Sequence, residues 1–291
     1  MLAGHHAVAI LLLALLLPAA AAASLDPYCD DNSTYAANGT FQANLDLLAA
    51  ALPANASASA TGSATAAVGA APDQADALAF CRGDTNASSC AACVAAAFRD
   101  ARRACPLHKG VTVYRDACVL RFAGRRFLDF LRDDKWLVSE LVPAIDTALG
   151  SVNASDAWFT AGVKAILTVM VDRTAAAAAA SNTTRNYFAT AEMEFHPKLY
   201  GLAQCAPGLT PAQCHSCLGY LLAVVTTQLL SGRAPGRSAF VVWCSLRYSV
   251  RRIYDGQAML QLPAPSQPAT TLTSSSSGLE LNCFQVSPDG V

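Results

Sequence analysis

The sequence predicts two tandem copies of one small, disulfide-stapled domain that combines helices with strands. Three observations carry this prediction. A cysteine triplet, C-x8-C-x2-C, occurs twice with identical spacing, at Cys81–Cys93 and at Cys205–Cys217. Similar segments precede and follow each triplet, and 291 residues give room for about two domains. The N-terminus resembles a secretory signal, and cysteines of secreted proteins are mostly paired in disulfides.

Residues 1–23 have the composition of a signal peptide. The apolar run Ala7–Leu17 ends at Pro18, and the small residues Ala21–Ala23 fit an A-x-A cleavage site. The run is shorter than a membrane-spanning helix, which disfavours the alternative of an uncleaved anchor. No other segment reaches spanning length, so we expect a secreted, extracellular protein without a transmembrane anchor.

Each copy begins with a predicted helix. The helices are expected at Gln42–Leu52 and Thr160–Asp172, where apolar residues recur at helical spacing. Stretches rich in alanine, serine and threonine follow, at Ala54–Ala71 and Ala175–Thr184. We expect these stretches to be loops that lead into the next strand.

A second helix is predicted near each C-x2-C, after a strand of small residues and leucine. In the second copy a capping box marks its start, with Thr210 as N-cap, Pro211 at N1 and Gln213 at N3. The later segments Cys118–Phe122 and Cys244–Tyr248 alternate in the manner of strands. Their cysteines would face the core, whereas Arg121 would point outward.

These elements place domain 1 at residues 25–129 and domain 2 at residues 138–255. Residues Leu137–Ser155 would join the two domains. The remaining residues, 256–291, are rich in serine, threonine and proline, and we expect them to form a disordered C-terminal tail.

Charge and sequons agree with an extracellular protein. The formal net charge is −1, so nothing in the composition points to nucleic acid as a partner. Six N-x-S/T sequons are candidate glycosylation sites. They lie at Asn32, Asn38, Asn55, Asn86, Asn153 and Asn182.

The repeat narrows the disulfide pairing. The second copy lacks counterparts of both Cys29 and Cys105, and Leu229 stands at the place of Cys105. Because the loss of one partner would strand the other, we predict a Cys29–Cys105 bond.

Two arrangements remain for the other cysteines of domain 1. Cys90 and Cys93 lie one helical turn apart and do not easily bond each other. We favour Cys81–Cys90 with Cys93–Cys118 over the crossed alternative, since Cys93 and Cys118 face the same core. The second copy would then hold Cys205–Cys214 and Cys217–Cys244. The eleventh cysteine, Cys283, is compatible with a free thiol or with a covalent dimer.

The duplicated C-x8-C-x2-C, with a further cysteine about 25 residues on, resembles the plant cysteine-rich repeat secretory proteins. Their repeat is the ginkbilobin-type, or stress-antifungal, domain. The resemblance covers Leu25 to about Asp255. It implies an α+β fold with two helices on one antiparallel sheet per domain, and it implies the favoured disulfide pairing. It also implies a plant apoplast protein of the secreted type or a truncated receptor, because receptor-like kinases carry the same tandem domain.

The mannose site of the single-domain member of this family does not carry over to this sequence. In the single-domain ginkbilobin, the sugar contacts are an Asn after the first cysteine, an Arg six residues before the last and a Glu five residues after it. Those places hold Asp30, Thr112 and Ala123 in the first copy. In the second copy the latter two are Ser238 and Ser249. None matches, so the ligand-binding residues stay unknown.

No catalytic or metal-binding pattern stands out. The C-x2-C pairs have better partners elsewhere than each other, which disfavours a thiol oxidoreductase. His196, His215 and the nearby cysteines lack the spacing of a zinc site, and no nucleophile motif is present. We therefore expect no enzyme, no cofactor and no metal.

Arginines recur in register after the last cysteine of each copy. We expect them to pair with carboxylates at the sheet surface or the domain interface, in preference to forming a ligand surface. They are Arg121, Arg125, Arg126, Arg247, Arg251 and Arg252. The sequence as a whole favours a non-enzymatic recognition protein of plant stress or defence that binds a protein or a cell-wall glycan. The alternative is a carbohydrate-binding antifungal protein.

Overall fold

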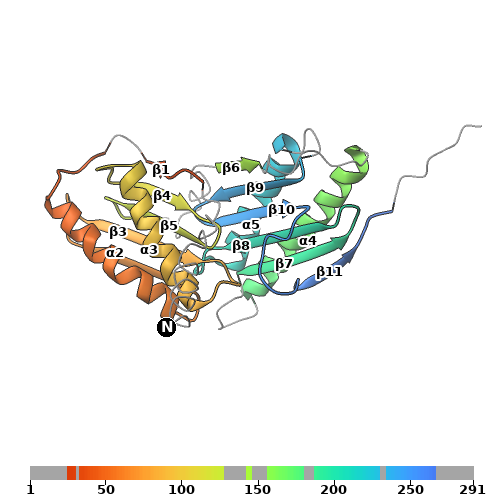
Figure 1. The fold of residues 1–291 in the computed structure, drawn as a ribbon, viewed down its shortest axis with the longest axis horizontal. Helices are drawn as coiled ribbons and strands as arrows, with labels where there is room; N and C mark the ends of the chain where they lie inside the picture. Colours follow the sequence, from red (N-terminus) through yellow and green to blue (C-terminus); the bar gives the residue numbers. More distant parts are fainter. Residues whose placement is uncertain are drawn as a thin grey trace, which may run out of the picture.

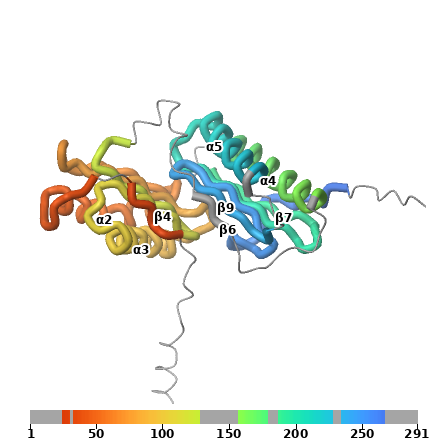
Figure 2. The backbone as a smooth tube through the Cα atoms, turned by 90° about the horizontal axis from the view of Figure 1, so that it is seen from above, coloured from red at the N-terminus to blue at the C-terminus, as the bar shows by residue number. Residues whose placement is uncertain are grey.

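The computed structural model describes residues 25–30, 33–127, 142–145, 156–179, 187–229 and 234–266. The chain forms two units of helix and sheet that lie side by side (Figures 1 and 2). Each unit has two helices packed on one sheet. The predicted α+β architecture with two tandem, disulfide-rich copies is thereby confirmed.

Domain 1 has helices α2 (Thr40–Ala58) and α3 (Ala87–Ala104) on an antiparallel sheet. The strand order is β1-β4-β5-β3-β2. The strands are β1 (Tyr28–Cys29), β2 (Ser63–Val68), β3 (Ala75–Cys81), β4 (Val111–Tyr114) and β5 (Cys118–Ala123).

Domain 2 repeats this plan and adds one strand. Helix α4 (Asp156–Ala179) and helix α5 (Pro211–Val224), which continues into a π-helix over Val225–Leu229, cover the sheet β11-β7-β8-β10-β9-β6. The strands are β6 (Val142–Ile145), β7 (Phe188–Glu194), β8 (Leu199–Cys205), β9 (Gly236–Val241), β10 (Cys244–Ser249) and β11 (Leu260–Pro263). Counterparts of β1 to β5 are β6, β7, β8, β9 and β10, so β11 is the additional strand.

The helices form where the apolar periodicity predicts them. In α2 the buried residues follow helical spacing and pack on the sheet; they are Phe41, Leu45, Leu48, Leu52 and Ala56. The start of α5 has the predicted capping box, since Gln213 N donates to Thr210 Oγ1 and Thr210 N donates to Gln213 Oε1.

The predicted loops are wrong over most of their length. Helix α2 continues to Ala58, and β2 occupies Ser63–Val68, so little of Ala54–Ala71 is a loop. Helix α4 likewise continues to Ala179. Alanine is the strongest helix former, and alternating small residues suit an edge strand. Low complexity is therefore no sign of irregular structure in these two segments, whose residues follow the periodicity of their helix or strand.

Two segments in which we predicted no strand contain one each. The segment Leu137–Ser155 includes β6, which pairs with β9 as β1 pairs with β4. The predicted disordered tail, residues 256–291, begins with ordered chain, because β11 pairs in parallel with β7. The indole Nε1 of Trp158 also donates to the Pro265 carbonyl at 3.1 Å. A strand can join a sheet edge through main-chain hydrogen bonds whatever its side-chain pattern. The sequence pattern therefore did not predict these two strands.

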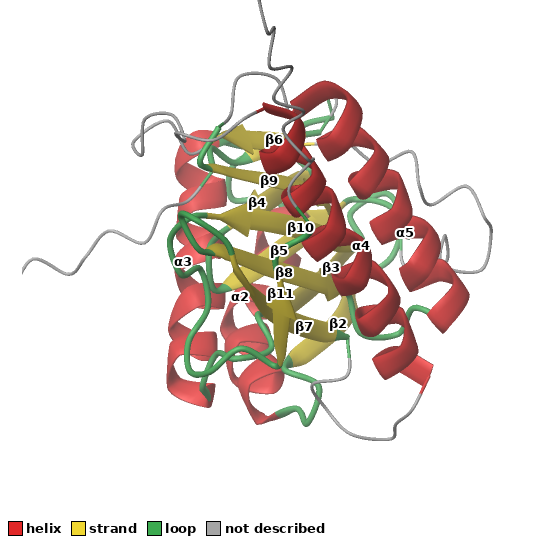
Figure 3. Cartoon of the chain, turned by 90° about the vertical axis from the view of Figure 1, so that its right-hand side faces the viewer, coloured by secondary structure: helices red, strands yellow, loops and turns green. Residues whose placement is uncertain are grey.

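The two sheets face each other between the helix pairs. Figure 3 places α2 and α3 on one side of the strands and α4 and α5 on the other. Alternate residues of β3 divide accordingly: Ala77 and Ala79 face the domain 1 helices, whereas Leu78 and Phe80 join the core cluster of domain 2. Tyr114 stacks obliquely on Phe240 across the boundary, with ring centroids 5.5 Å apart. The domains therefore share part of one hydrophobic core.

Candidate functional site

Five disulfides join ten cysteines of the described chain. They link Cys29 to Cys105, Cys81 to Cys90, Cys93 to Cys118, Cys205 to Cys214 and Cys217 to Cys244. The structure thus brings together the favoured partners and not the crossed ones. Neither C-x2-C motif forms a bond within itself, so these motifs are not dithiol sites of the thioredoxin kind.

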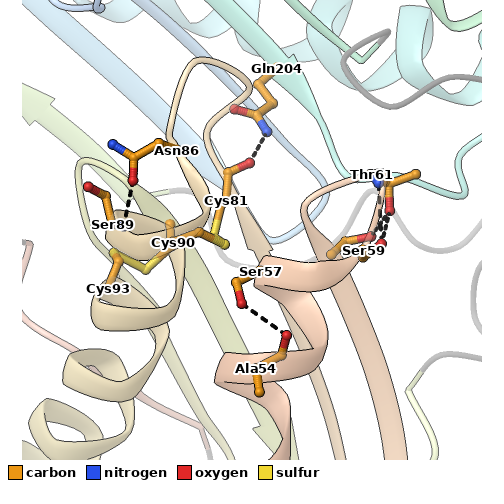
Figure 4. The surroundings of a disulfide bond; sticks show 12 residues. Ala54, Ser57, Ser59, Thr61, Cys81, Asn86, Ser89, Cys90, Cys93 and Gln204 are labelled. Atoms are coloured by element: carbon orange, nitrogen blue, oxygen red, sulfur yellow. Dashed lines mark hydrogen bonds between the residues drawn. A yellow bond between two sulfur atoms is a disulfide. The ribbon is translucent and has the colours of Figure 1, made fainter.

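The Cys81–Cys90 bond ties the end of β3 to the first turn of α3 (Figure 4). Asn86 is the N-cap of α3, and its side-chain oxygen accepts a hydrogen bond from Ser89 N at 2.9 Å. A glycan would be attached to the amide nitrogen of Asn86 and would leave this oxygen in place. Capping and glycosylation at Asn86 are therefore compatible.

Three predicted sequons lie in the described chain, and each presents an exposed asparagine. They are Asn38, Asn55 and Asn86. The other predicted sequons, Asn32, Asn153 and Asn182, lie outside the described residues, as do Cys283 and the signal segment 1–23.

In domain 1 two of the expected sugar-contact positions are bound to one arginine. Arg121 Nη2 lies 2.5 Å from Asp30 Oδ2, and its Nη1 donates to Thr112 Oγ1 at 2.7 Å. All three residues are buried. The Arg121 side chain lies on the face of the sheet opposite the helices, as predicted. It is buried there and not exposed, and its guanidinium lies 5.3 Å from the centre of the Phe127 ring. The carboxylate of Asp30 is thus occupied by an internal ion pair.

Domain 2 keeps the arginine and changes its acid. Arg247, the counterpart of Arg121, donates from Nε to Ser238 Oγ at 3.2 Å, as Arg121 donates to Thr112. Its Nη1 bonds Asp116 of domain 1 at 2.8 Å. Ser249, the other expected contact position, is buried and accepts a hydrogen bond from Arg251 N. The repeated arginine therefore pairs with an acid of its own domain in the first copy and with an acid of the other domain in the second.

Asp116 is the centre of an ion network between the domains. Besides Arg247, it accepts from Arg82 Nη1 at 2.7 Å. Arg82 also pairs with Asp84 at 2.5 Å and with Asp255 at 3.4 Å, and Asp255 N donates to Asp84. Close by, Gln204 Nε2 donates to the Cys81 carbonyl at 2.8 Å, as Figure 4 shows. Among the arginines that the repeat singled out, Arg247 thus pairs with a carboxylate at the domain interface, whereas Arg82 was not predicted to take part.

The network sets the protonation of Asp116. Burial favours its neutral form, but the charges of Arg247 and Arg82 and their hydrogen bonds outweigh burial and lower the pKa of Asp116. A carboxyl whose pKa is lowered by folding stabilises the folded state above its unfolded pKa, about 3.9. This stabilisation disappears as the pH falls through the lower, folded pKa.

We therefore expect Asp116→Asn to destabilise the domain boundary in a pH-dependent manner. The free energy of unfolding should fall by about 1–2 kcal/mol, by the same amount between about pH 7 and 5. The expected loss is smaller than for a fully buried pair because the Asp116 side chain is 35% exposed. It should shrink below about pH 4. Urea unfolding of both proteins across this range measures the difference. A loss of equal size at low and neutral pH would contradict the assigned charge role.

A hollow of about 290 Å³ lies between the end of α2 and the start of α3, beside the Cys81–Cys90 bond. We call it the hydroxyl hollow, since its lining includes Ser57, Ser59, Thr61 and Thr85. Figure 4 shows Ser57 in the last turn of α2 and Ser59 and Thr61 just after it. The hydroxyl oxygen of Thr85 is buried and has no hydrogen-bond partner among the described residues. No motif indicates this place, because Ser57, Ser59 and Thr61 lie in the predicted loop Ala54–Ala71, whereas Thr85 lies in a separate segment before α3.

No group of three or more histidine, cysteine or acidic side chains within the described ranges could hold a metal ion.

Three more of the repeated arginines lie at the surface or near it. Arg252 donates a hydrogen bond to the Gly256 carbonyl and lies 3.6 Å from Glu192, whereas Arg125 and Arg251 are exposed. None of the helices in the described chain is both long and apolar enough to span a membrane.

Comparison with known proteins identifies the repeat. The family described as salt stress response/antifungal matches residues 28–125 and 148–251. A cysteine-rich receptor-like protein kinase 6 of Oryza sativa subsp. japonica is 42% identical over 273 residues, which cover 89% of this chain and 37% of that protein. A cysteine-rich receptor-like protein kinase 6 of Arabidopsis thaliana is 29% identical and covers 83% of this chain. The chain thus spans little more than a third of these kinases.

Solved structures support the same fold. The tandem DUF26 ectodomain of the Arabidopsis thaliana receptor-like protein PDLP8 superposes with a TM-score of 0.61 at 18% identity, covering 78% of this chain and 96% of that one. The corresponding ectodomain of PDLP5 gives a TM-score of 0.60 at 15% identity, with coverage of 78% and 98%.

Proposed function

Because the chain belongs to the salt stress response/antifungal family as a tandem ectodomain, we propose that it is a non-enzymatic recognition protein of the plant apoplast. In this role it acts in stress or defence and binds an extracellular protein or a cell-wall ligand. Disulfide stapling and exposed sequons suit an extracellular location. The kinase activity of its relatives belongs to those longer proteins and is not part of the proposal.

The observation that carries the proposal is the Arg121–Asp30–Thr112 cluster. Carbohydrate sites present directed polar groups to the ligand. Here the two polar residues at the expected positions, Asp30 and Thr112, both accept hydrogen bonds from Arg121 and are buried. To bind mannose as ginkbilobin does, the protein would first have to break a buried ion pair, which costs several kcal/mol. Recognition through another surface avoids this cost.

A glycan array tests this proposal. The mature protein, secreted from a eukaryotic host and confirmed oxidised, should give no binding to mannans above the level of a heat-denatured control. Reproducible binding to mannose polymers that is lost in the double variant Asp30→Ala with Arg121→Met, which removes the buried pair as a unit, would contradict the proposal. A clean negative would direct the search to extracellular proteins such as receptor ectodomains.

The hydroxyl hollow favours a second candidate, carbohydrate binding at a different place. Its volume of about 290 Å³ accommodates a sugar ring, and sugars bind through hydrogen bonds to hydroxyl-bearing side chains. Thr85 lines this hollow, and its unpartnered hydroxyl would offer one such bond if the side chain turned toward the sugar. Glycan binding that survives the double variant Asp30→Ala with Arg121→Met but disappears in Thr85→Val would favour this candidate. The substitution should leave stability unchanged, since Thr85 loses no internal hydrogen bond.

A further inference from the structure

The two copies contain corresponding edge strands, β2 and β7. Ser63 lies opposite Phe80, one residue before Cys81, and Phe188 lies opposite Gln204, one residue before Cys205. This register aligns the tripeptide Ala64–Ala66 with Ala189–Ala191, and both read Ala-Thr-Ala. The two edges therefore have the same backbone register and the same central threonine.

In domain 2 this edge is occupied. Strand β11 runs parallel to β7, with Leu260 beside Ala191. The Thr190 hydroxyl accepts a hydrogen bond from Met259 N at 3.1 Å and is buried. Leu260 and Leu262 pack against the domain core, and the side chain of Gln261 bonds Glu192. The chain thus shows what kind of segment fits such an edge.

In domain 1 the same edge has no partner strand within the described part of the chain. Strand β2 pairs only with β3 there. Cys81 N donates to the Gly62 carbonyl, so by alternation Ala64 and Ala66 face β3 with their backbone groups. The backbone N–H and C=O groups of Ser63, Thr65 and Ala67 point to the free edge. Thr65, the counterpart of buried Thr190, is exposed.

This edge also lacks the features that usually protect one. Strand β2 contains no charged residue, no proline and no glycine over its six residues. The chain that follows β5 does not reach this edge at either of its described ends. The Phe127 ring contacts the Trp243 ring, and Val142 pairs with β9. An extended peptide can therefore pair with Thr65 and its neighbours by main-chain hydrogen bonds.

We propose that the free edge of β2 binds an extended, uncharged peptide segment of a partner protein as an additional parallel strand. The parallel direction follows from β11 on β7. Apolar side chains at alternate positions of the peptide would extend the helix-facing layer of Ala64, Ala66 and Val68. Ala67 replaces Glu192, so the edge offers no carboxylate for a polar side chain. The inference rests on the proposed recognition function and specifies the chemistry of the partner.

The test uses the whole oxidised protein and a blocked peptide with the sequence of residues 257–266, which contains β11. Amide resonances of Ser63, Thr65 and Ala67 should shift saturably, with a Kd of about 0.1–1 mM, as befits one short strand. Thr65→Pro should weaken binding at least about tenfold, because its ring removes the outward N–H and leaves the bonds to β3 intact. Thr65→Ser is the matched control and should bind as the natural protein does.

A gain of affinity provides a second readout. Ala67→Glu restores the carboxylate found in β7 and should tighten binding about threefold to tenfold. The same variant should show no gain with a peptide whose glutamine at position 261 is replaced by alanine. Shifts confined to β7, no shift at about millimolar peptide, or self-association through β2 would each overturn the proposal. Such a result would leave the recognition function untouched, because the glycan array and the partner search test it separately.

Discussion

Asp30→Ala should destabilise domain 1 by about 3–5 kcal/mol, among the largest effects of any single substitution in this chain. Removal of the carboxylate leaves the Arg121 guanidinium buried without a counter-charge, since its other bond is to the neutral Thr112 hydroxyl. The packing around the pair is tight, because a Cβ added at Gly110 would lie 2.7 Å from that of Asp30. A hollow of about 70 Å³ borders Asp30 on another side, so water that enters it can offset part of this loss.

The double variant Asp30→Ala with Arg121→Met is the matched control. It removes both charges and keeps an apolar stem beside Phe127, so it should regain most of the lost stability. Hydrogen exchange of domain 1 amides such as Val113 and Leu120 measures both proteins without assuming that the two domains unfold together. If Asp30→Ala cost less than about 1 kcal/mol, the buried ion pair would not have the role assigned to it.

Removal of the Cys29–Cys105 bond should cost about 4–5 kcal/mol in the same domain. The bond spans 76 residues and fixes β1, a strand of two residues, against the end of α3. Alanine at both positions avoids a stray thiol. The Cys81–Cys90 bond spans only 9 residues, so its removal should cost less, about 3 kcal/mol. The order of the two double variants in domain-resolved hydrogen exchange checks the prediction, and a reversed order would contradict it.

The repeat explains why so much of the fold was predictable. Two copies of one cysteine spacing indicated the domain plan, and the apolar stripes of α2 and α4 indicated the helices. What could not be predicted depends on contacts between distant residues. Strand β6 pairs with β9, a strand far along the chain, and β2 and β11 have compositions that also occur in loops.

The candidate site was predictable only in its components. Arg121 and Arg247 were singled out by their repetition, but their acids are Asp30, at the N-terminus of domain 1, and Asp116, in the other domain. A sequence pattern does not show which residues far apart in the chain come close together in space. The hydroxyl hollow was missed for the same reason, because its walls come from α2 and from the start of α3.

The most direct test of the account is a titration of the amide-labelled natural protein with methyl α-mannoside, read at the residues around Asp30 and Arg121. The account predicts that these resonances stay unchanged at concentrations that saturate a mannose lectin, because the polar groups there bind each other. Saturable shifts at Asp30, Thr112 and Arg121 would mean that the cluster opens for the sugar. They would contradict the conclusion that recognition takes place on another surface.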